Sequence, residues 1–274
     1  MQKISRKLKL SGKSIGFVPT MGFLHEGHLS LVRKSKKTAD ITVVSIFVNP
    51  TQFAPNEDLD KYPRDVKRDK SLLIKEGVDF VFLPREEEIY SADYQTYVEV
   101  EKISKHLEGE YRPTHFKGVT TIVTILFNSV NPDFVFFGQK DAQQAAVIKQ
   151  MIKDLKFDIK IRVCPVVREQ DGLAMSSRNT YLSIKERKDA LVLSKSLKLA
   201  DTMIKKGETK SQSIIKEMKE LINSVDNATL DYIKVVNADN FEEEQIISKG
   251  KKYYILVACR IGNTRLIDNI LIKI

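Results

Sequence analysis

The sequence predicts an α/β protein with a doubly wound, Rossmann-like parallel sheet over residues 1–175 and a smaller α+β C-terminal domain over residues 176–274. Up to about residue 167, short apolar runs alternate with amphipathic segments of helical period, as they do in βα units. The run at 41–48 is β-branched and apolar on both faces, which is typical of a buried parallel strand. After about residue 178 the pattern changes to long helices followed by strands.

Each element of the first domain follows from its local pattern. Short β-branched and aromatic runs predict strands, and longer amphipathic stretches predict helices. Gly77 follows the second helix as its expected C′ residue. The predicted strands cover 15–18, 41–48, 79–83, 134–137 and 159–163, and the predicted helices cover 27–37, 65–76, 116–130 and 142–155.

The second domain begins with a helix start signal. Ser183-Ile184-Lys185-Glu186 has the form of a capping box, and the amphipathic helix that follows runs to about Gly207. A second helix is expected over 211–225. The predicted strands cover 230–236, 253–260 and 265–274, which gives a small, lid-like α+β domain.

Composition excludes several classes of protein. Of 274 residues, 42% are hydrophobic and 30% are charged, which rules out wholesale disorder. The net charge of +9 is spread along the chain among acidic residues, so we expect neither nucleic acid nor membrane as a partner. No apolar window has the length of a transmembrane helix, and no apolar region follows the basic start of the chain.

The two cysteines, Cys164 and Cys259, lie far apart and have no CxxC neighbourhood. This argues against a zinc site and favours a reduced, cytoplasmic setting, with a disulfide between them as the minor alternative.

The string PTMGFLHEGH at 19–28 occupies the turn from the first strand into the first helix, where open α/β sheets bind ligands. His25 and His28 are three residues apart, so both imidazoles can face one side. Gly22 and Gly27 permit close backbone approach, and exposed N–H groups with the helix dipole favour a phosphate. The alternative is a capping turn with surface histidines. Two of the four histidines within four residues favour the functional interpretation.

Two further turns follow predicted strands. In VNPTQF, at 48–53, the Gln52 amide carries both a donor and an acceptor, although a purely turn-forming role is equally supported. In FGQKDAQQ, at 137–144, Gly138 permits close approach, Lys140 supplies a positive charge and Asp141 can cap the next helix. By itself this second string favours an ordinary capped surface helix.

The fourth string, VVREQDGLAMSSRN at 166–179, lies between the two predicted domains. Its adjacent hydroxyls and the guanidinium of Arg178 suit a polyphosphate, whereas the alternative is a simple linker.

Taken together, these motifs resemble, in order, those of the pantoate–β-alanine ligase family, within the nucleotidylyltransferase superfamily that carries the HIGH-type HxGH signature. YPRD at 62–65, LEGEYRPTHF at 107–116 and RIGNTRLIDN at 260–269 extend the resemblance. Thr114 departs from the glycine usual in that family, and the N-terminus is shorter than usual.

The resemblance implies an AMP-forming carbon–nitrogen ligase that condenses (R)-pantoate with β-alanine in pantothenate and coenzyme A biosynthesis. A pantoyl-adenylate forms from pantoate and ATP, and AMP and diphosphate are released. Mg²⁺ as a cofactor and a homodimer are also implied, whereas the protein ligands of the metal stay open. His28 is labelled a proton donor in the family, and hydrogen bonding to the transition state would explain its role equally well.

The resemblance also assigns residues to roles. The implied catalytic residues are His25, His28, Lys140 and Arg178. The implied ATP-binding residues are Met21, Gly22, Phe23, Leu24, His25, Glu26, Gly27, His28, Gly138, Gln139, Lys140, Asp141, Val167, Met175, Ser176, Ser177 and Arg178. The implied pantoate and β-alanine residues are Gln52, Gln144 and Asn49.

Two rival hypotheses are another member of the same superfamily and a protein of a different class. A nucleotidylyltransferase would leave the nucleotide on its product, and VNPTQF together with Gln144 argues against it. A non-catalytic nucleic-acid-binding module would show a basic face with interleaved aromatic residues, whereas the helices here carry mixed charge.

Overall fold

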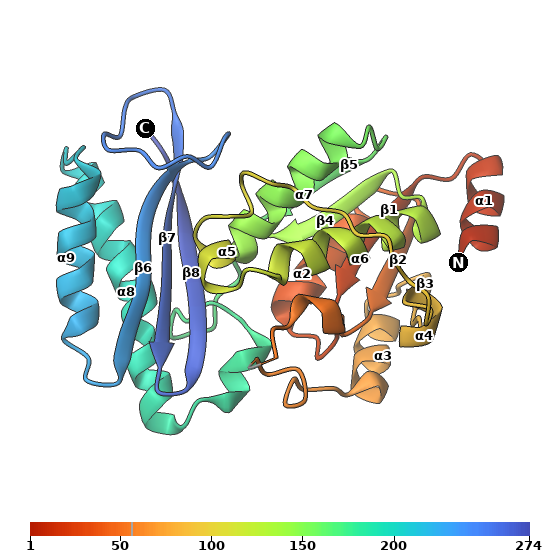
Figure 1. Ribbon diagram of the computed structural model, residues 1–274, viewed down its shortest axis with the longest axis horizontal. Coiled ribbons are helices and arrows are strands. Elements are labelled where there is room, and N and C mark those ends of the chain that lie inside the picture. The colour runs from red at the N-terminus through yellow and green to blue at the C-terminus, as the bar shows by residue number, and fades with distance from the viewer. Residues whose placement is uncertain (56) are drawn as a thin grey trace. The chain divides into compact units, whose positions relative to one another are not determined.

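The computed structural model describes residues 1–55 and 57–274, which form two compact units, Met1–Pro165 and Val166–Ile274. The predicted domain boundary, after residue 175, lies ten residues further along the chain than this division. Each unit contains its own sheet and its own hydrophobic core (Figure 1).

The first unit contains the predicted parallel sheet, which has five strands in the order β3-β2-β1-β4-β5. These strands are β1 (Ile15–Thr20), β2 (Ile41–Ile46), β3 (Phe80–Phe82), β4 (Phe134–Gly138) and β5 (Lys160–Cys164). The central strand β1 pairs in parallel with both β2 and β4. The strand order reverses between β1 and β4: from β1 the chain continues to β2 on one side of the sheet, and from β4 it continues to β5 on the other side. In sheets of this kind ligands bind at such a switch point.

Helices cover both faces of this sheet. They are α1 (Gln2–Leu10), α2 (Glu26–Lys36), α3 (Val66–Lys75), α4 (Glu86–Ile89), α5 (Glu108–Tyr111), α6 (His115–Val130) and α7 (Ala142–Asp154), with short 3-10 turns η1 (Pro50–Gln52) and η2 (Gln139–Asp141). Phe17 packs in a core with α6 and α7, whereas its neighbour Val18 packs in a core with α2 and α3. This alternation explains why strands such as β1 are apolar on both faces.

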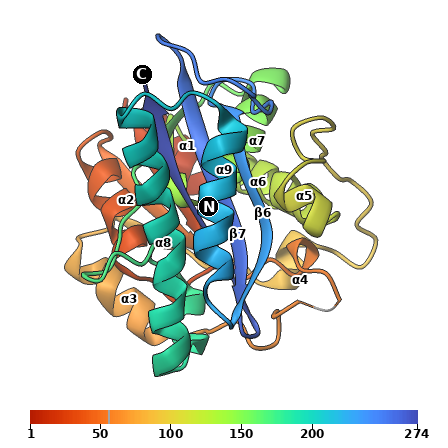
Figure 2. The same ribbon diagram turned by 90° about the vertical axis from the view of Figure 1, so that its left-hand side faces the viewer.

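The second unit is the predicted α+β arrangement. It contains η3 (Ser177–Tyr181), α8 (Ile184–Lys205), α9 (Ser211–Asn223) and the strands β6 (Ala228–Asn237), β7 (Lys252–Ile261) and β8 (Thr264–Lys273). The strands form an antiparallel sheet in the order β6-β7-β8, and α8 and α9 pack on one face of it (Figure 2). The predicted capping box is confirmed, because Ser183 and Glu186 exchange side-chain-to-backbone hydrogen bonds at the start of α8.

Three further features bear on the sequence predictions. Within the described part of the chain, every helix is too short or too polar to cross a bilayer.

Cys164 and Cys259 are both buried as free thiols, and burial raises the pKa of Cys259 to about 12. The helices α1, α4 and α5 were not predicted, since two of them span a single turn and α1 is rich in basic residues.

Candidate active site

The loop between β1 and α2 has a strained backbone. Gly22 has a φ of +85° and Phe23, which is not a glycine, has a φ of +49°. A Cβ atom at position 22 would lie 2.8 Å from Cγ2 of Ile46 and 3.0 Å from Oδ2 of Asp69. Glycine is therefore required at this position both for its backbone conformation and for space.

Asp69, on α3, holds this loop in place. Its carboxylate is 1% exposed and accepts hydrogen bonds from the backbone nitrogens of Phe23, at 2.7 Å, and Leu24, at 2.8 Å. The guanidinium of the neighbouring Arg68 lies 5.1 Å from the centre of the Phe23 ring. The sequence patterns did not identify Asp69, although it follows the YPRD string by four residues.

These contacts correct one expectation about phosphate binding. The backbone N–H groups of Phe23 and Leu24 are not free for an anion, because the Asp69 carboxylate occupies them. The N–H of Gly22 donates to Oγ1 of Thr20, and the N–H of Gly27 donates to the His25 side chain. An anion at this loop would therefore have to be held mainly by side chains and by the dipole of α2.

His25 and His28 cap the start of α2 reciprocally. Nδ1 of His25 accepts from the N–H of Gly27 at 3.2 Å, and Nδ1 of His28 accepts from the N–H of His25 at 3.3 Å. The centres of the two rings lie 4.1 Å apart. Since each Nδ1 accepts a hydrogen bond, each neutral ring carries its proton on Nε2. The site thus has two neighbouring Nε2–H donors.

Charge and desolvation keep His28 neutral. Removal of the ring from water, followed by the effects of His25 and of the Lys140 ammonium, lowers the pKa of His28 well below its ordinary value. Lys140 belongs to η2, directly after β4, whereas His28 follows β1. The switch point of the sheet therefore brings together two motifs that are more than a hundred residues apart in the chain.

The turn after β4 leaves open space. A Cβ atom at Gly138 would meet no atom of the protein within 4 Å, and the φ of Gly138 is −79°, which any residue can adopt. Asp141 stands at the N-cap position of α7 but makes no capping hydrogen bond, contrary to the sequence prediction. Its carboxylate lies 3.6 Å from the Lys140 ammonium instead. Electrostatic attraction to this ammonium competes with a capping hydrogen bond from the α7 backbone for the Asp141 carboxylate.

A buried network fixes the amide of Gln52. Asn49, which is 1% exposed, donates from Nδ2 to Oε1 of Gln52 at 3.2 Å and to the carbonyl oxygen of Gly118 at 3.1 Å. Oδ1 of Asn49 accepts from the hydroxyl of Tyr90 at 2.7 Å. The Gln52 amide therefore directs its Nε2 away from Asn49, toward the sulfur of Met21 at 2.8 Å.

The backbone of Gln52 is held from α5 and α6. Its carbonyl oxygen accepts from Nδ1 of the buried His115 at 3.0 Å, and Arg112 also reaches this oxygen. Arg112 in turn pairs with Glu57 through two N–H groups. Both basic residues belong to the LEGEYRPTHF string, which thus supports the Gln52 segment.

The two adjacent glutamines on α7 differ in their surroundings. Gln143 is 4% exposed, donates to the carbonyl oxygens of Ile103 and His106, and accepts from the N–H of Glu108. Gln144 is partly exposed. A helical step of about 100° separates consecutive side chains, so Gln143 supports the fold while Gln144 faces a different direction.

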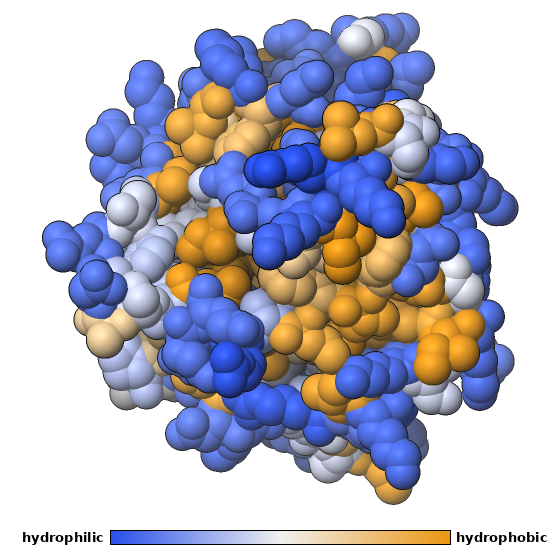
Figure 3. All heavy atoms as spheres, turned by 90° about the vertical axis from the view of Figure 1, so that its right-hand side faces the viewer, coloured by the Kyte–Doolittle hydropathy of each residue, from blue (hydrophilic) through white to orange (hydrophobic). Residues whose placement is uncertain are grey.

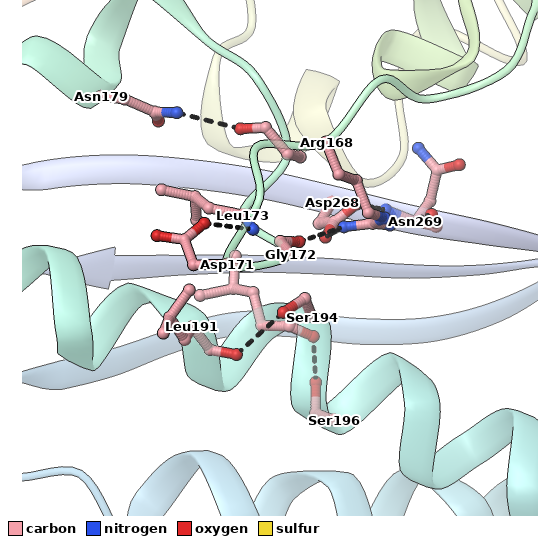
Figure 4. Close-up of polar contacts among 12 residues, drawn as sticks. Arg168, Asp171, Gly172, Leu173, Asn179, Leu191, Ser194, Ser196, Asp268 and Asn269 are labelled. Carbon is pink, nitrogen blue, oxygen red and sulfur yellow. Dashed lines mark hydrogen bonds and ion pairs between the residues drawn. The ribbon is translucent and has the colours of Figure 1, made fainter.

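In the second unit, the predicted polyphosphate loop is tightly organised (Figure 4). Arg168 pairs with Asp268 of β8, and the N–H of Arg178 donates to Oγ of Ser176, which caps η3. Ser177 is buried, and Met175 and Arg178 are partly exposed. These groups belong to the second unit, whereas the two histidines, Lys140 and Gln52 belong to the first.

A protein-bound metal site is not evident. Across residues 1–55 and 57–274, no three His, Cys, Asp or Glu side chains gather in a way that could hold a metal ion.

Comparisons with known proteins agree with this geometry. A family model described as pantoate-beta-alanine ligase matches residues 1–271. A protein of Caldicellulosiruptor bescii named pantothenate synthetase is 59% identical over 274 residues, which cover 100% of this chain and 96% of the relative. A pantothenate synthetase of Acetivibrio thermocellus is 56% identical over 274 residues, covering 100% and 97% respectively.

Solved structures give the same result. The crystal structure of pantothenate synthetase from Thermus thermophilus has a TM-score of 0.91 and 40% identity, and the match covers 97% of this chain and 96% of the other. The Francisella tularensis pantoate-beta-alanine ligase, complexed with beta-gamma ATP and beta-alanine, has a TM-score of 0.77 and 35% identity, and covers 98% and 95%. Sequence and fold match over nearly the whole length, so the chain belongs to the pantoate–β-alanine ligase family and is an enzyme of that family.

Proposed function

We propose that this chain joins (R)-pantoate to β-alanine at the expense of ATP, through a pantoyl-adenylate. A carboxylate oxygen of pantoate attacks the α-phosphorus of ATP, and the bond to the diphosphate leaving group breaks. The β-alanine nitrogen then attacks the acyl carbon and loses a proton, and the acyl C–O bond breaks to release AMP. The adenylate is needed because a carboxylate is a poor electrophile, whereas its mixed anhydride has a good leaving group.

The observation that carries this proposal is the neighbouring pair of imidazole donors at the switch point. His25 and His28 each have an Nε2–H that is not used in capping, and Lys140 adds positive charge close to His28. Such donors stabilise the negative charge that develops on phosphate oxygens during transfer at the α-phosphorus.

The pKa direction of His28 favours one of the two roles considered for it. A ring with a strongly lowered pKa is neutral near pH 7, so it is a poor proton donor but a good hydrogen-bond donor. We therefore assign to His28 the stabilisation of charge in the transition state.

Gln52 and Gln144 are proposed to bind pantoate, with Gln52 also beside β-alanine. The network around Asn49 holds Oε1 of the Gln52 amide and directs Nε2 toward Met21; we propose that this N–H group donates to a substrate oxygen. Because both polar atoms of the Asn49 side chain have partners in the protein, its proposed role is to orient Gln52.

ATP is proposed to contact Gly138, at which an added Cβ atom would meet no protein atom within 4 Å, together with Val167 and Met175 to Arg178 of the second unit. A ligase of the same family from Francisella tularensis has been crystallised with beta-gamma ATP and beta-alanine, which supports both substrates. Mg²⁺ would be held by phosphate oxygens and water, and it would neutralise charge on the phosphates.

The remaining proposals concern the setting of the enzyme. We propose a cytoplasmic homodimer that acts on small molecules and binds neither nucleic acid nor membranes. All three residues of the edge strand β3 are partly exposed, which would allow a second copy of the chain to contact this edge. Figure 3 views the first unit from the side on which β3 lies and shows apolar area among polar side chains. Light scattering coupled to size exclusion would show a single mass near that of one chain if the dimer is wrong.

A coupled assay of AMP release tests the reaction. We expect AMP only when pantoate, β-alanine and ATP are all present. Pantoate-dependent exchange of labelled diphosphate into ATP, without β-alanine, would reveal the adenylate. A nucleotide retained on the final product would instead indicate a nucleotidylyltransferase.

A further inference from the structure

Two segments that are about a hundred residues apart in the chain meet in the second unit. Arg168 lies in the 166–179 loop, and Asp268 lies on β8, in the RIGNTRLIDN string to which the proposed reaction assigns no role. Nη1 of Arg168 donates to Oδ2 of Asp268 at 2.6 Å, and Nη2 donates to Oδ1 at 2.9 Å. Asp268 is only 3% exposed. Two parallel bonds from a guanidinium to one carboxylate fix both distance and orientation.

The same guanidinium also holds the loop itself. Nη1 of Arg168 donates to the carbonyl oxygen of Gly172 at 3.1 Å, and Figure 4 shows the Arg168 side chain reaching both Gly172 and Asp268. Backbone hydrogen bonds from Glu169 to Leu173 and from Met175 to Val167 close the turn. Strand β8 therefore anchors a turn that is already closed on itself.

A second anchor comes from α8. Nη2 of Arg187 donates to Oε2 of Glu169 at 2.8 Å and to Oδ2 of Asp171 at 2.7 Å. The Arg187 side chain is 34% exposed, so this anchor lies nearer to solvent than the first. The turn is thus tied to two different elements of the same unit.

The anchored turn leads directly into residues 175–178. Leu173 and Ala174, just before this segment, are buried at 4% and 5% exposure. Asn179, just after it, donates from Nδ2 to the carbonyl oxygen of Ala174 at 3.0 Å and to Oε1 of Glu169 at 2.8 Å. The residues that flank 175–178 on either side are therefore hydrogen-bonded to each other, and Asn179 is also hydrogen-bonded to Glu169 in the anchored turn.

We propose that Asp268 and Arg187 are positioning residues for ATP: through Arg168 and Glu169 they hold residues 175–178 in the conformation that binds the nucleotide. The inference rests on the proposed function, in which this segment binds ATP. Neither residue is assigned a contact with the reacting atoms. A loop ordered before the ligand arrives loses less conformational freedom on binding, and so binds more tightly.

The experiment compares Asp268→Asn with a matched control, Asp231→Asn. Asp231 lies on β6 and accepts from Nε of Arg265 at 2.6 Å, which is an equally short Arg–Asp contact to β8 away from the loop. Titration calorimetry with β,γ-methylene-ATP measures binding, and amide hydrogen exchange over 168–175 measures the order of the loop. We expect Asp268→Asn to raise the Kd about tenfold and to speed exchange, and Asp231→Asn to change the Kd by less than about twofold.

Arg187→Gln provides a second variant in case Asp268→Asn does not fold. Its control is Lys205→Gln, which removes an exposed ion pair with Asp201 on the same helix. Arg187→Gln should raise the Kd severalfold, and Lys205→Gln should leave it unchanged.

Two results would overturn the proposal. One is faster exchange in the loop with an unchanged Kd, and the other is an equal rise of the Kd in a test variant and its control. Failure of the proposed function would look different, because the wild-type chain would then neither bind the ATP analogue nor release AMP. In that case unchanged exchange in the variants would still refute the anchoring.

Discussion

The carboxylate of Asp69 lies 2.7 Å from the backbone nitrogen of Phe23, and through this contact α3 fixes the loop that precedes the two histidines. The residue before Phe23 already has a positive φ, so two consecutive residues are held in a conformation that is unfavourable for most side chains. A buried carboxylate that accepts two adjacent N–H groups offsets this cost.

Asp69→Asn should therefore affect both stability and activity. The new amide can accept from only one of the two N–H groups, so we expect the free energy of unfolding to fall by about 1–3 kcal/mol. The kcat should also fall, because this loop directly precedes His25 and His28 and so sets the position of both rings. Urea denaturation and AMP release measure the two effects. Asp79→Asn, which removes the charge of a carboxylate that accepts from the backbone N–H of Thr42, should leave kcat unchanged.

His28→Ala should reduce adenylate formation by about a hundredfold or more, in line with the loss of a positioned donor to the transition state. Diphosphate exchange dependent on pantoate measures this step directly. His106→Ala removes an exposed imidazole and serves as the control. Near-normal exchange in the His28 variant would refute the assigned role.

Gly138→Ala should leave the fold intact and weaken ATP binding. The added methyl group meets no protein atom and the backbone conformation suits alanine, so the melting temperature should not fall. If ATP occupies the space beside Gly138, the KM for ATP should rise about tenfold through steric conflict. An unchanged KM would place the nucleotide elsewhere.

Tyr90→Phe should raise the KM for pantoate several-fold with little change in kcat. The variant removes the hydroxyl that donates to Asn49 and so loosens the orientation of the Gln52 amide. Initial rates at varied pantoate provide the measurement. Tyr94→Phe, on a ring that packs against Tyr90 at 5.0 Å, is the control. Equal effects of the two variants would indicate a general packing change.

His115 predicts a pH dependence of stability. Burial, followed by the charge of Arg112, lowers the pKa of His115 to about 4, whereas the unfolded ring titrates near its ordinary value. Between these values the unfolded state binds more protons, so stability rises with pH and is lost as the pH falls from about 6.5 to about 4. The loss is at most about 3 kcal/mol.

His115→Asn tests this, since its amide can still donate to the Gln52 carbonyl oxygen. The difference in unfolding free energy between wild type and variant should shrink or reverse in sign as the pH falls from 7 to 4. A difference that is constant over this range would show that His115 is not the titrating group.

The sequence by itself determined the two sheets and most of their helices. Apolar runs such as 41–48 are local signals of buried strands, and the capping box at Ser183 marks a helix start through contacts within four residues. The motifs around His25, Gln52 and Lys140 were also local, so their residues could be identified before their arrangement was known.

Only the tertiary structure decided which of these residues act together and which support them. Asp69 and Tyr90 lie outside the motifs, and Asp268 lies in the RIGNTRLIDN string, to which no role was assigned; their partners are 41 to 100 residues away in the chain. The occupied amides of Phe23 and Leu24, and the Asp141 carboxylate that turns to Lys140, also depend on neighbours outside the local string. Such contacts form through packing between elements, and local periodicity does not encode them.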